Sequence, residues 1–312
     1  MTGGRGFIGK NVVKSLEKLD SIEKIYSVDI SPIGIVENNK SEKVIQIVSN
    51  LASETEVQLL PDKVDYVFAL AAVNGTSRFY SEPFYVLYNS ILPTVFVIKK
   101  YAGSAQILYS SSSEVYSCGV ELGLSPVPTA EDVPIVFSDL SNPRWSYGSS
   151  KALGEFALHA AAREFGCVGT IVRYHNVFEP DMGKNHFVPD FVEKAISKDF
   201  SILGAEQTRS FIFVDDAVEA TILAISKASS EIPCYHIGTN NEISILDAGK
   251  IILDLMGIDE SELKLLPAPI GSVSRRCPSV KKLMTEFNWR PEIDLVEGLR
   301  RYIEWRLKRT DV

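Results

Sequence analysis

Residues 2–9 read Thr2-Gly3-Gly4-Arg5-Gly6-Phe7-Ile8-Gly9, and a pattern typical of an amphipathic helix covers about residues 8–19. Glycines three positions apart let the backbone approach a ligand closely. The helix start adds unpaired N–H groups and the positive end of its dipole, which suit a pyrophosphate. The stretch therefore predicts a dinucleotide-binding turn. The residues of this turn expected to contact the cofactor are Gly3, Gly6, Phe7, Ile8 and Gly9.

An acidic residue ends the next expected strand, which covers residues 24–29. Asp29 stands about 20 residues after Gly9, where a carboxylate accepts hydrogen bonds from the hydroxyls of the adenosine ribose. The same carboxylate would repel a 2′-phosphate. The expected cofactor is therefore NAD and not NADP.

A strand should also precede the glycines, because such a turn joins the central strand of the sheet to a helix. The sequence before Gly3 is too short to supply it. Without this strand, edges in the middle of the sheet would be left unpaired. We expect an apolar strand upstream of Met1 in the natural product, or a shortened chain.

Strand and helix patterns alternate through the first half of the chain. Further strands are expected at residues 43–50, 65–72 and 106–110, with a helix over residues 83–101. The strand at 65–72 is apolar almost throughout, as in parallel sheets covered on both faces. The alternation predicts an α/β fold with a doubly wound parallel sheet, whose ligands bind at the carboxyl ends of the strands. Residues near those ends expected beside the cofactor are Asn50, Leu51, Ala71 and Ala72.

The alternation stops near Val177, which predicts two lobes. We expect an NAD-binding domain over residues 1–176, to which residues 210–238 return. A smaller lobe, mainly residues 177–312, is expected to bind the substrate. A chain of 312 residues with 45% hydrophobic content is long enough for both cores.

Composition narrows the possible partners. The net charge is −8, and no basic run is long enough to follow a nucleic-acid backbone. No apolar run of about 18 residues is present, so we expect no membrane span. The four cysteines are widely spaced and lack ligand spacing, which predicts no metal, no disulfide framework and a reducing cytoplasm.

Tyr147 and Lys151 share one face of an expected helix, within the run Ser146-Tyr147-Gly148-Ser149-Ser150-Lys151. A fixed ammonium near a phenol favours the phenolate and lowers the phenol's pKa from its usual value of about 10. The pair therefore predicts a tyrosine that acts as a base. Before it, the strand at 106–110 runs into Ser110-Ser111-Ser112-Ser113-Glu114, which places polar groups at the ligand-binding edge of the sheet.

With these motifs in order, the chain resembles the extended short-chain dehydrogenase/reductase superfamily, specifically its NAD-dependent nucleotide-sugar epimerases and dehydratases. The resemblance runs nearly end to end. Its motifs are TGGxGFIG at residues 2–9, Asp29, Ala71-Ala72, SSSxVY at 111–116, YxxxK at 147–151, RxxN at 173–176, the block 209–216 and Asn288-Trp289-Arg290-Pro291. Departures are Ala69, where a histidine is usual, and Asn50, where an aspartate is common.

The resemblance implies a catalytic set and a substrate. Tyr147 would be the base, Lys151 its partner and Ser112 the hydroxyl that bonds the sugar 4-oxygen while NAD accepts hydride from C4. The substrate would be a nucleotide-diphosphate sugar, with UDP favoured. Residues implied to bind it are Ser113, Asn176, Val188, Arg209 and Arg276. Apolar residues on more than one face of the helices near 83–101 and 147–163 further predict a homodimer.

Glu114 indicates which reaction would come after the 4-keto stage. By resemblance, 4,6-dehydratases and UDP-glucuronate decarboxylases carry a glutamate at this position, whereas galactose-type 4-epimerases commonly have a neutral residue. A carboxylate beside C5 would remove the acidified proton there, or assist loss of a 6-carboxylate. Ser113 replaces the aspartate of some dehydratases, so both routes stay open. The alternatives are a 4-epimerase and a dinucleotide-binding sensor without catalysis.

Overall fold

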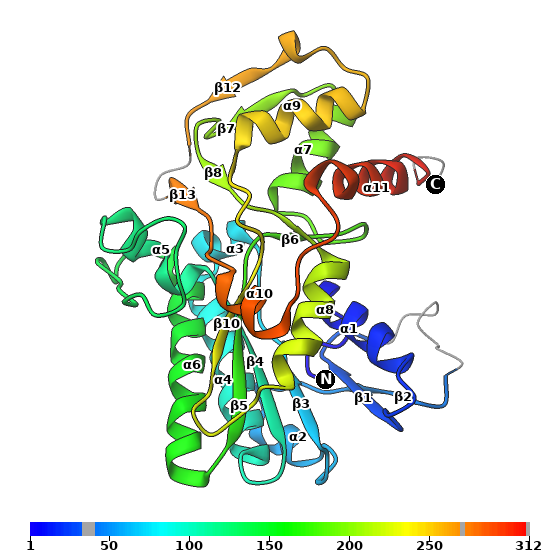
Figure 1. Ribbon diagram of the computed structural model, residues 1–312, viewed down its shortest axis with the longest axis vertical. Helices are drawn as coiled ribbons and strands as arrows, with labels where there is room; N and C mark the ends of the chain where they lie inside the picture. The colour runs from blue at the N-terminus through cyan, green and yellow to red at the C-terminus, as the bar shows by residue number, and fades with distance from the viewer. Residues whose placement is uncertain (33–40, 269–271, 310–312) are drawn as a thin grey trace.

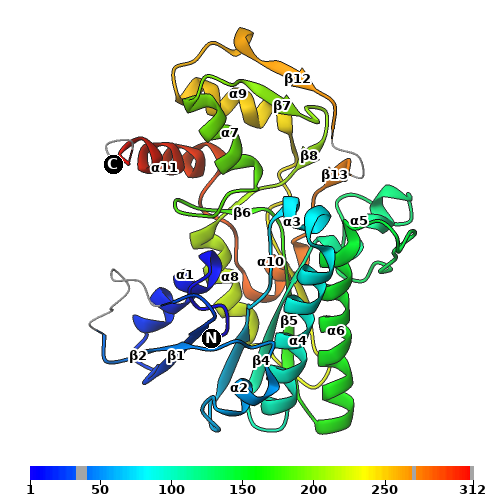
Figure 2. The same cartoon turned by 180° about the vertical axis from the view of Figure 1, so that it is seen from behind.

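The computed structural model describes residues 1–32, 41–268 and 272–309, and these form a larger and a smaller lobe (Figure 1). A twisted sheet with helices on both faces makes the larger lobe. Short strands and helices α7, α9 and α11 make the smaller lobe at its carboxyl edge (Figures 1 and 2). In chain order the elements are α1 (Phe7–Glu17), β1 (Ile25–Asp29), β2 (Val44–Val48), α2 (Glu54–Gln58), β3 (Tyr66–Ala69), α3 (Thr76–Ser81), α4 (Pro83–Tyr101), β4 (Gln106–Ser112), α5 (Glu114–Glu121), α6 (Trp145–Phe165), β5 (Val168–Tyr174), β6 (Val177–Phe178), α7 (Phe187–Ile196), β7 (Ser201–Leu203), β8 (Thr208–Arg209), β9 (Ile212–Phe213), α8 (Val214–Ile225), β10 (Cys234–Ile237), β11 (Ile243–Ser244), α9 (Ile245–Leu255), η2 (Glu260–Glu262), β12 (Lys264–Leu266), β13 (Arg275–Arg276), α10 (Lys281–Phe287) and α11 (Leu295–Leu307).

The large sheet is parallel in every pairing between its named strands. Four strands lie in the order β10-β5-β4-β3, and β1 pairs with β2 beside them. Both faces of β4 and β5 are covered, so their burial is nearly continuous, as their apolar sequences require. The α/β doubly wound fold expected from the alternating pattern is confirmed.

Residues 1 and 2 join the two parts of this sheet. Thr2 forms parallel bridges to Val28 at the end of β1 and to Ala69 at the end of β3. Met1 and Thr2 thus stand where the last residues of a central strand would stand. In both views the N-terminus lies between the β1–β2 pair and β3 (Figures 1 and 2).

Two apolar clusters pack on opposite faces of the sheet. One includes Val12 and Leu16 of α1 with Ala224 of α8, and it continues into the smaller lobe. The other includes Ile98 of α4 and Leu158 of α6. Their burial fixes α1 and α6 against the strands that carry the polar groups of the site.

Helix α6 lies unusually close to β4. At Gly154 an added Cβ would overlap the hydroxyl of Tyr109, so only glycine permits this approach. The helix ends at Gly166, whose φ of 69° is the left-handed conformation typical of a helix C-terminus. These two glycines set where α6 sits and where it stops, and therefore where Tyr147 and Lys151 lie.

The expected elements differ from the observed ones mainly near the site. Strand β4 extends to Ser112, two residues beyond the expected end at residue 110, and α5 begins at Glu114. Of the returning segment 210–238, β10 joins the large sheet beside β5 and α8 packs on it. Strand β9, however, pairs with β6 outside that sheet. We retain the division into two functional lobes as a proposal.

Candidate active site

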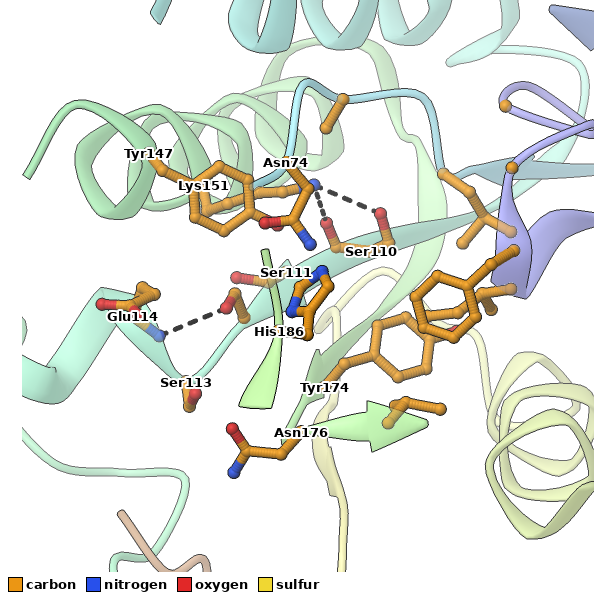
Figure 3. A pocket seen from close by; sticks show the side chains of 18 of the residues that line it. Asn74, Ser110, Ser111, Ser113, Glu114, Tyr147, Lys151, Tyr174, Asn176 and His186 are labelled. Atoms are coloured by element: carbon orange, nitrogen blue, oxygen red, sulfur yellow. Dashed lines mark hydrogen bonds between the residues drawn. The ribbon is translucent and has the colours of Figure 1, made fainter. Parts of the chain in front are cut away.

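A cavity of about 270 Å³ opens at the carboxyl edge of the large sheet. Glycine-turn residues line one side, the end of β4 lines the floor, and α6 contributes Tyr147 and Lys151 (Figure 3). A second cavity of about 370 Å³ continues toward the smaller lobe. The predicted site residues that line the first cavity are Gly3, Gly6, Phe7, Ile8, Gly9, Ala72, Ser112, Ser113, Glu114, Tyr147, Lys151, Asn176 and Arg276.

The glycine turn has the shape that a pyrophosphate requires. Gly3 has a φ of 66°, and an added Cβ there would lie 2.9 Å from the Ala71 nitrogen. An added Cβ at Gly9 would overlap the Gly3 carbonyl oxygen. Side chains are therefore excluded at Gly3 and Gly9. Helix α1 begins directly after Gly6, so the unpaired N–H groups of its first turn belong to residues that line the cavity. The turn fits a dinucleotide.

Four predicted cofactor contacts lie outside the lining of this cavity: Asp29, Asn50, Leu51 and Ala71. Asp29 ends β1 as expected, and its carboxylate accepts hydrogen bonds from the backbone N–H groups of Arg5 and Ser31 at 3.1 and 3.0 Å. Those bonds hold it beside the glycine turn. Asn50 uses its side-chain oxygen for the Ala52 N–H at 3.1 Å, and Leu51 is buried. The roles of these four residues remain predictions.

Tyr147, Ser112 and Lys151 lie together as their sequence pattern predicts. Tyr147 lines the cavity together with Ser112, and it stacks on Phe79 of α3 with ring centroids 5.0 Å apart. The Lys151 ammonium lies 5.6 Å from the centroid of the Tyr147 ring. It donates to the Ser110 carbonyl oxygen at 2.6 Å and to the Ser110 hydroxyl at 3.3 Å (Figure 3).

The expected effect of Lys151 on Tyr147 is not seen in this structure. Burial, with a further contribution from Glu114, raises the pKa of Tyr147 above its ordinary value. Burial also lowers the pKa of Lys151 to about 7, against an opposing effect of Glu155. Desolvation penalises both charged forms, and the ammonium points to Ser110 instead of the phenol oxygen. The sequence pattern predicts that Tyr147 and Lys151 lie next to each other, but it does not predict how burial shifts their pKa values.

Glu114 lies between two arginines. Its Oε1 accepts from Arg276 Nη2 at 2.8 Å and from Arg144 Nη2 at 3.1 Å, and both Glu114 and Arg144 are buried. Burial alone would raise the pKa of Glu114, but Arg276 and Arg144 reverse this, so its pKa lies below the ordinary value. A carboxylate stabilised in this way is a weak base. This geometry does not favour the C5-base role expected from the sequence.

The remaining predicted substrate residues lie toward the second cavity. Val188, in the first turn of α7, and Arg209, at the end of β8, line it. Burial and the neighbouring Arg276 lower the pKa of Arg209 to about 9. Asn176 lines both cavities, and its amide donates to the Ser210 carbonyl oxygen at 2.7 Å. An elongated, anionic ligand would fit along this path.

Comparisons with known proteins give the family. The sequence profile described as "NAD dependent epimerase/dehydratase family" matches residues 1–238. The chain belongs to this family. The resemblance stated from the motifs is therefore confirmed, and the cofactor of this NAD-dependent family member is NAD.

Individual members of the epimerase/dehydratase family align over nearly the whole chain. UDP-N-acetyl-alpha-D-glucosaminuronate decarboxylase of Bacillus cytotoxicus is 28% identical, with 98% of this chain and 96% of that protein covered. A putative UDP-glucose 4-epimerase of Methanocaldococcus jannaschii is also 28% identical, with coverage of 98% and 97%. The crystal structure of UDP-glucose 4-epimerase from Thermotoga maritima, with UDP-glucose, superimposes with a TM-score of 0.83 at 27% identity, covering 98% and 97%. Family members thus include decarboxylases and epimerases.

Sequence reasoning missed several residues of this family member's cavities. Arg144, immediately before α6, contacts Glu114, and Asn74 and Phe79 come from the segment around α3. Arg144 stands three residues before Tyr147, at the start of the same expected helix. This spacing is the sequence feature that could have identified Arg144 as a site residue. His186 lines both cavities, and burial lowers its pKa. Within the described residues, no group of three or more His, Cys, Asp or Glu side chains is placed to hold a metal.

Proposed function

We propose that this protein oxidises C4 of a nucleotide-diphosphate sugar with NAD and then acts at C6 of a uronic acid, as a UDP-uronate decarboxylase. The observation that carries the proposal is the arginine cluster around Glu114, a few residues from Ser112 and Tyr147. Names of relatives support the nucleotide: both of the 28% identical proteins act on, or are described as acting on, UDP-sugars.

The arginine cluster has more positive charge than Glu114 balances. Arg144, Arg276 and Arg209 all influence the Glu114 carboxyl. The Nε atoms of Arg144 and Arg276 are buried and have no hydrogen-bond partner. Buried guanidinium N–H groups without acceptors are costly, and a carboxylate satisfies them in pairs. A substrate carboxylate next to the sugar ring supplies what these groups lack.

The proposed reaction has two stages, oxidation at C4 and loss of the C6 carboxylate as CO₂. Bound NAD would supply the hydride acceptor at C4. Tyr147, in its phenolate form, would take the proton of the 4-hydroxyl, and Ser112 would bond the same oxygen. A C4 ketone lies β to the C6 carboxylate, so the C5–C6 bond breaks with its electron pair moving to the C4 oxygen, and CO₂ leaves. A proton then returns to C5. In this decarboxylation Glu114 does not act as a base. Its carboxylate orients Arg144 and Arg276, to which it is hydrogen bonded.

Mass spectrometry of a reaction with NAD and a UDP-uronic acid tests the proposal. We expect loss of CO₂ from the sugar nucleotide, and no such loss with Tyr147→Phe although that variant still binds NAD. Loss of water from a UDP- or dTDP-hexose would instead identify a 4,6-dehydratase. Unchanged mass with altered sugar stereochemistry would identify a 4-epimerase. Either of these outcomes would contradict decarboxylation.

The 4-epimerase is the second candidate because the Thermotoga epimerase shares the fold over nearly the full chain. A non-catalytic dinucleotide sensor is disfavoured by the complete set of Ser112, Tyr147 and Lys151 in one cavity.

We also propose a homodimer formed through α4 and α6, which lie side by side (Figure 2). These helices expose large apolar side chains, which water solvates poorly. The exposed residues are Phe84, Tyr85, Tyr88, Val95, Leu153 and Phe156. A cytoplasmic location is proposed from the four free cysteines. Within the described residues, no helix is long and apolar enough to cross a membrane.

A further inference from the structure

Tyr147 stands in the first turn of α6, where a helix is held least firmly, because the first N–H groups have no partner within the helix. Arg144, at the cap position, makes no capping hydrogen bond with its side chain. Lys151 lies one turn deeper and is anchored on the Ser110 carbonyl oxygen (Figure 3). The position of the Tyr147 ring therefore depends on what packs against it.

A small apolar cluster supplies that packing. Its buried members are Phe79 of α3, Val86 of α4 and Tyr147, and Ala72 and Val73 pack against them. This cluster is separate from the two larger clusters that cover the faces of the sheet. The position of the Tyr147 ring is therefore set by α3 and α4, and not by the main cores.

Phe79 covers one face of the Tyr147 ring. The two rings are nearly parallel, with an interplanar angle of 8° and centroids 5.0 Å apart. Stacking of this kind is favourable, and close packing around buried rings leaves them little freedom to tilt. Both side chains are buried, with 3% and 8% of their surface exposed, and both line the first cavity. Phe79 therefore fixes the plane of the phenol and keeps water from one of its faces.

Helix α3 is itself held in place. It follows Gly75, whose φ of 121° is a conformation that residues with a side chain rarely adopt, and it leads into Pro83 at the start of α4. The Ser77 hydroxyl donates to the side-chain oxygen of Asn185 at 2.9 Å. Asn185 precedes α7 in the smaller lobe and lines the second cavity. Helix α3 is thus tied to both lobes, and it carries Phe79 to the catalytic cavity from a fixed position.

We propose that Phe79 is a positioning residue for Tyr147, and that its ring holds the phenol oxygen within reach of the sugar 4-hydroxyl during hydride transfer to NAD. This inference rests on the C4 oxidation proposed above. Phe79 has no group that could transfer a proton, so its effect falls on the rate of the hydride step and not on the affinity for either ligand. A misplacement of about 1 Å can slow an enzymatic step about 100-fold.

Three variants test this role. Phe79→Leu removes the ring but keeps an apolar side chain, and Phe79→Tyr keeps the ring. Phe165→Leu is the matched control, because it makes the same change at a residue that is 54% exposed at the end of α6. Steady-state kinetics compare UDP-sugars that carry hydrogen or deuterium at C4, and titration calorimetry measures the affinities for NAD and for the UDP-sugar.

We expect Phe79→Leu to lower kcat about 10- to 100-fold and to increase the deuterium isotope effect on kcat, because hydride transfer then limits turnover. Both dissociation constants should stay within about 3-fold of the wild-type values, which shows that the variant is folded. Phe79→Tyr should recover most of the lost rate, and Phe165→Leu should match wild type.

Unchanged kcat and an unchanged isotope effect in Phe79→Leu would overturn the proposal. So would a fall in kcat that both Phe79 variants share, or one matched by an equal loss of affinity for NAD or the UDP-sugar. The product formed by wild type answers a separate question. If it converts a UDP-hexose and releases no CO₂ from a UDP-uronic acid, decarboxylation is contradicted, and the Phe79 comparison is made on the hexose.

Discussion

At the scale of single residues, burial controls the charges of the site more than sequence spacing does. Tyr147 and Lys151 stand one helical turn apart, yet desolvation raises the pKa of the phenol and lowers that of the ammonium to about 7. Glu114 stays ionised because Arg144 and Arg276 bond it. The site therefore holds its positive charge around Glu114, where we expect the substrate carboxylate.

The buried Lys151 should make stability depend on pH. Between its folded pKa of about 7 and its ordinary value near 10.5, the unfolded chain binds more protons, so stability rises with pH across this window. Lys151→Met removes the penalty. In cofactor-free protein we expect the variant to be more stable at pH 7, by at most about 5 kcal/mol, with the difference shrinking toward pH 10.

Urea unfolding at several pH values measures this difference. The exposed Lys14→Met on α1 is the control and should leave the pH dependence unchanged. A difference between wild type and Lys151→Met that stays constant from pH 7 to 10 would mean that Lys151 is not desolvated in solution.

Arg144 should bind the substrate carboxylate. Arg144→Gln removes a charge-assisted donor, and we expect KM for a UDP-uronic acid to rise about 10- to 100-fold, with little change in KM for a UDP-hexose. Steady-state kinetics with both substrates checks this. Arg163→Gln, at an exposed position near the end of α6, changes the charge equally and should have no effect. Equal losses for both substrates would assign Arg144 a purely structural role.

At the scale of elements, the glycine turn and helix α6 bring the two halves of the site together. The turn works because backbone packs on backbone: side chains at Gly3 and Gly9 would overlap the chain itself. Helix α6 reaches β4 because Gly154 makes room for Tyr109. The glycines at these contacts therefore determine where the reactive residues Tyr147 and Lys151 lie relative to the turn.

Gly9→Ala should disrupt the cofactor turn, because the new methyl group overlaps the Gly3 carbonyl oxygen. We expect NAD affinity to fall at least about 10-fold, by titration calorimetry, together with a lower unfolding midpoint. At Gly103 an added Cβ meets no atom within 4 Å, so Gly103→Ala is the matched control. Unchanged NAD affinity in Gly9→Ala would show that the turn does not bind the dinucleotide.

At the scale of the whole molecule, the proposed dimer face follows α4 and α6. Phe156 is 72% exposed, and a charge there should oppose burial against a second copy. We expect Phe156→Asp to shift the protein from dimer to monomer in light scattering with little change in its fold. Leu140→Asp, at an exposed site outside α4 and α6, should leave the mass unchanged. A wild-type protein that is monomeric at micromolar concentrations would contradict the proposal.

The sequence alone determined the fold class, the family and the cofactor. Glycine spacing, strand–helix alternation and YxxxK are local patterns, and local backbone geometry follows from local sequence. The resemblance to the family also implied that Ser112, Glu114, Tyr147 and Lys151 belong to one site, and all four line one cavity.

Only the tertiary structure decided how these groups are charged and partnered. The pairing of Glu114 with Arg276 joins residues far apart in the chain, and the contribution of Arg144 depends on how α6 meets α5. Burial and long-range contact set pKa values and cavities, and neither can be read from spacing along the chain.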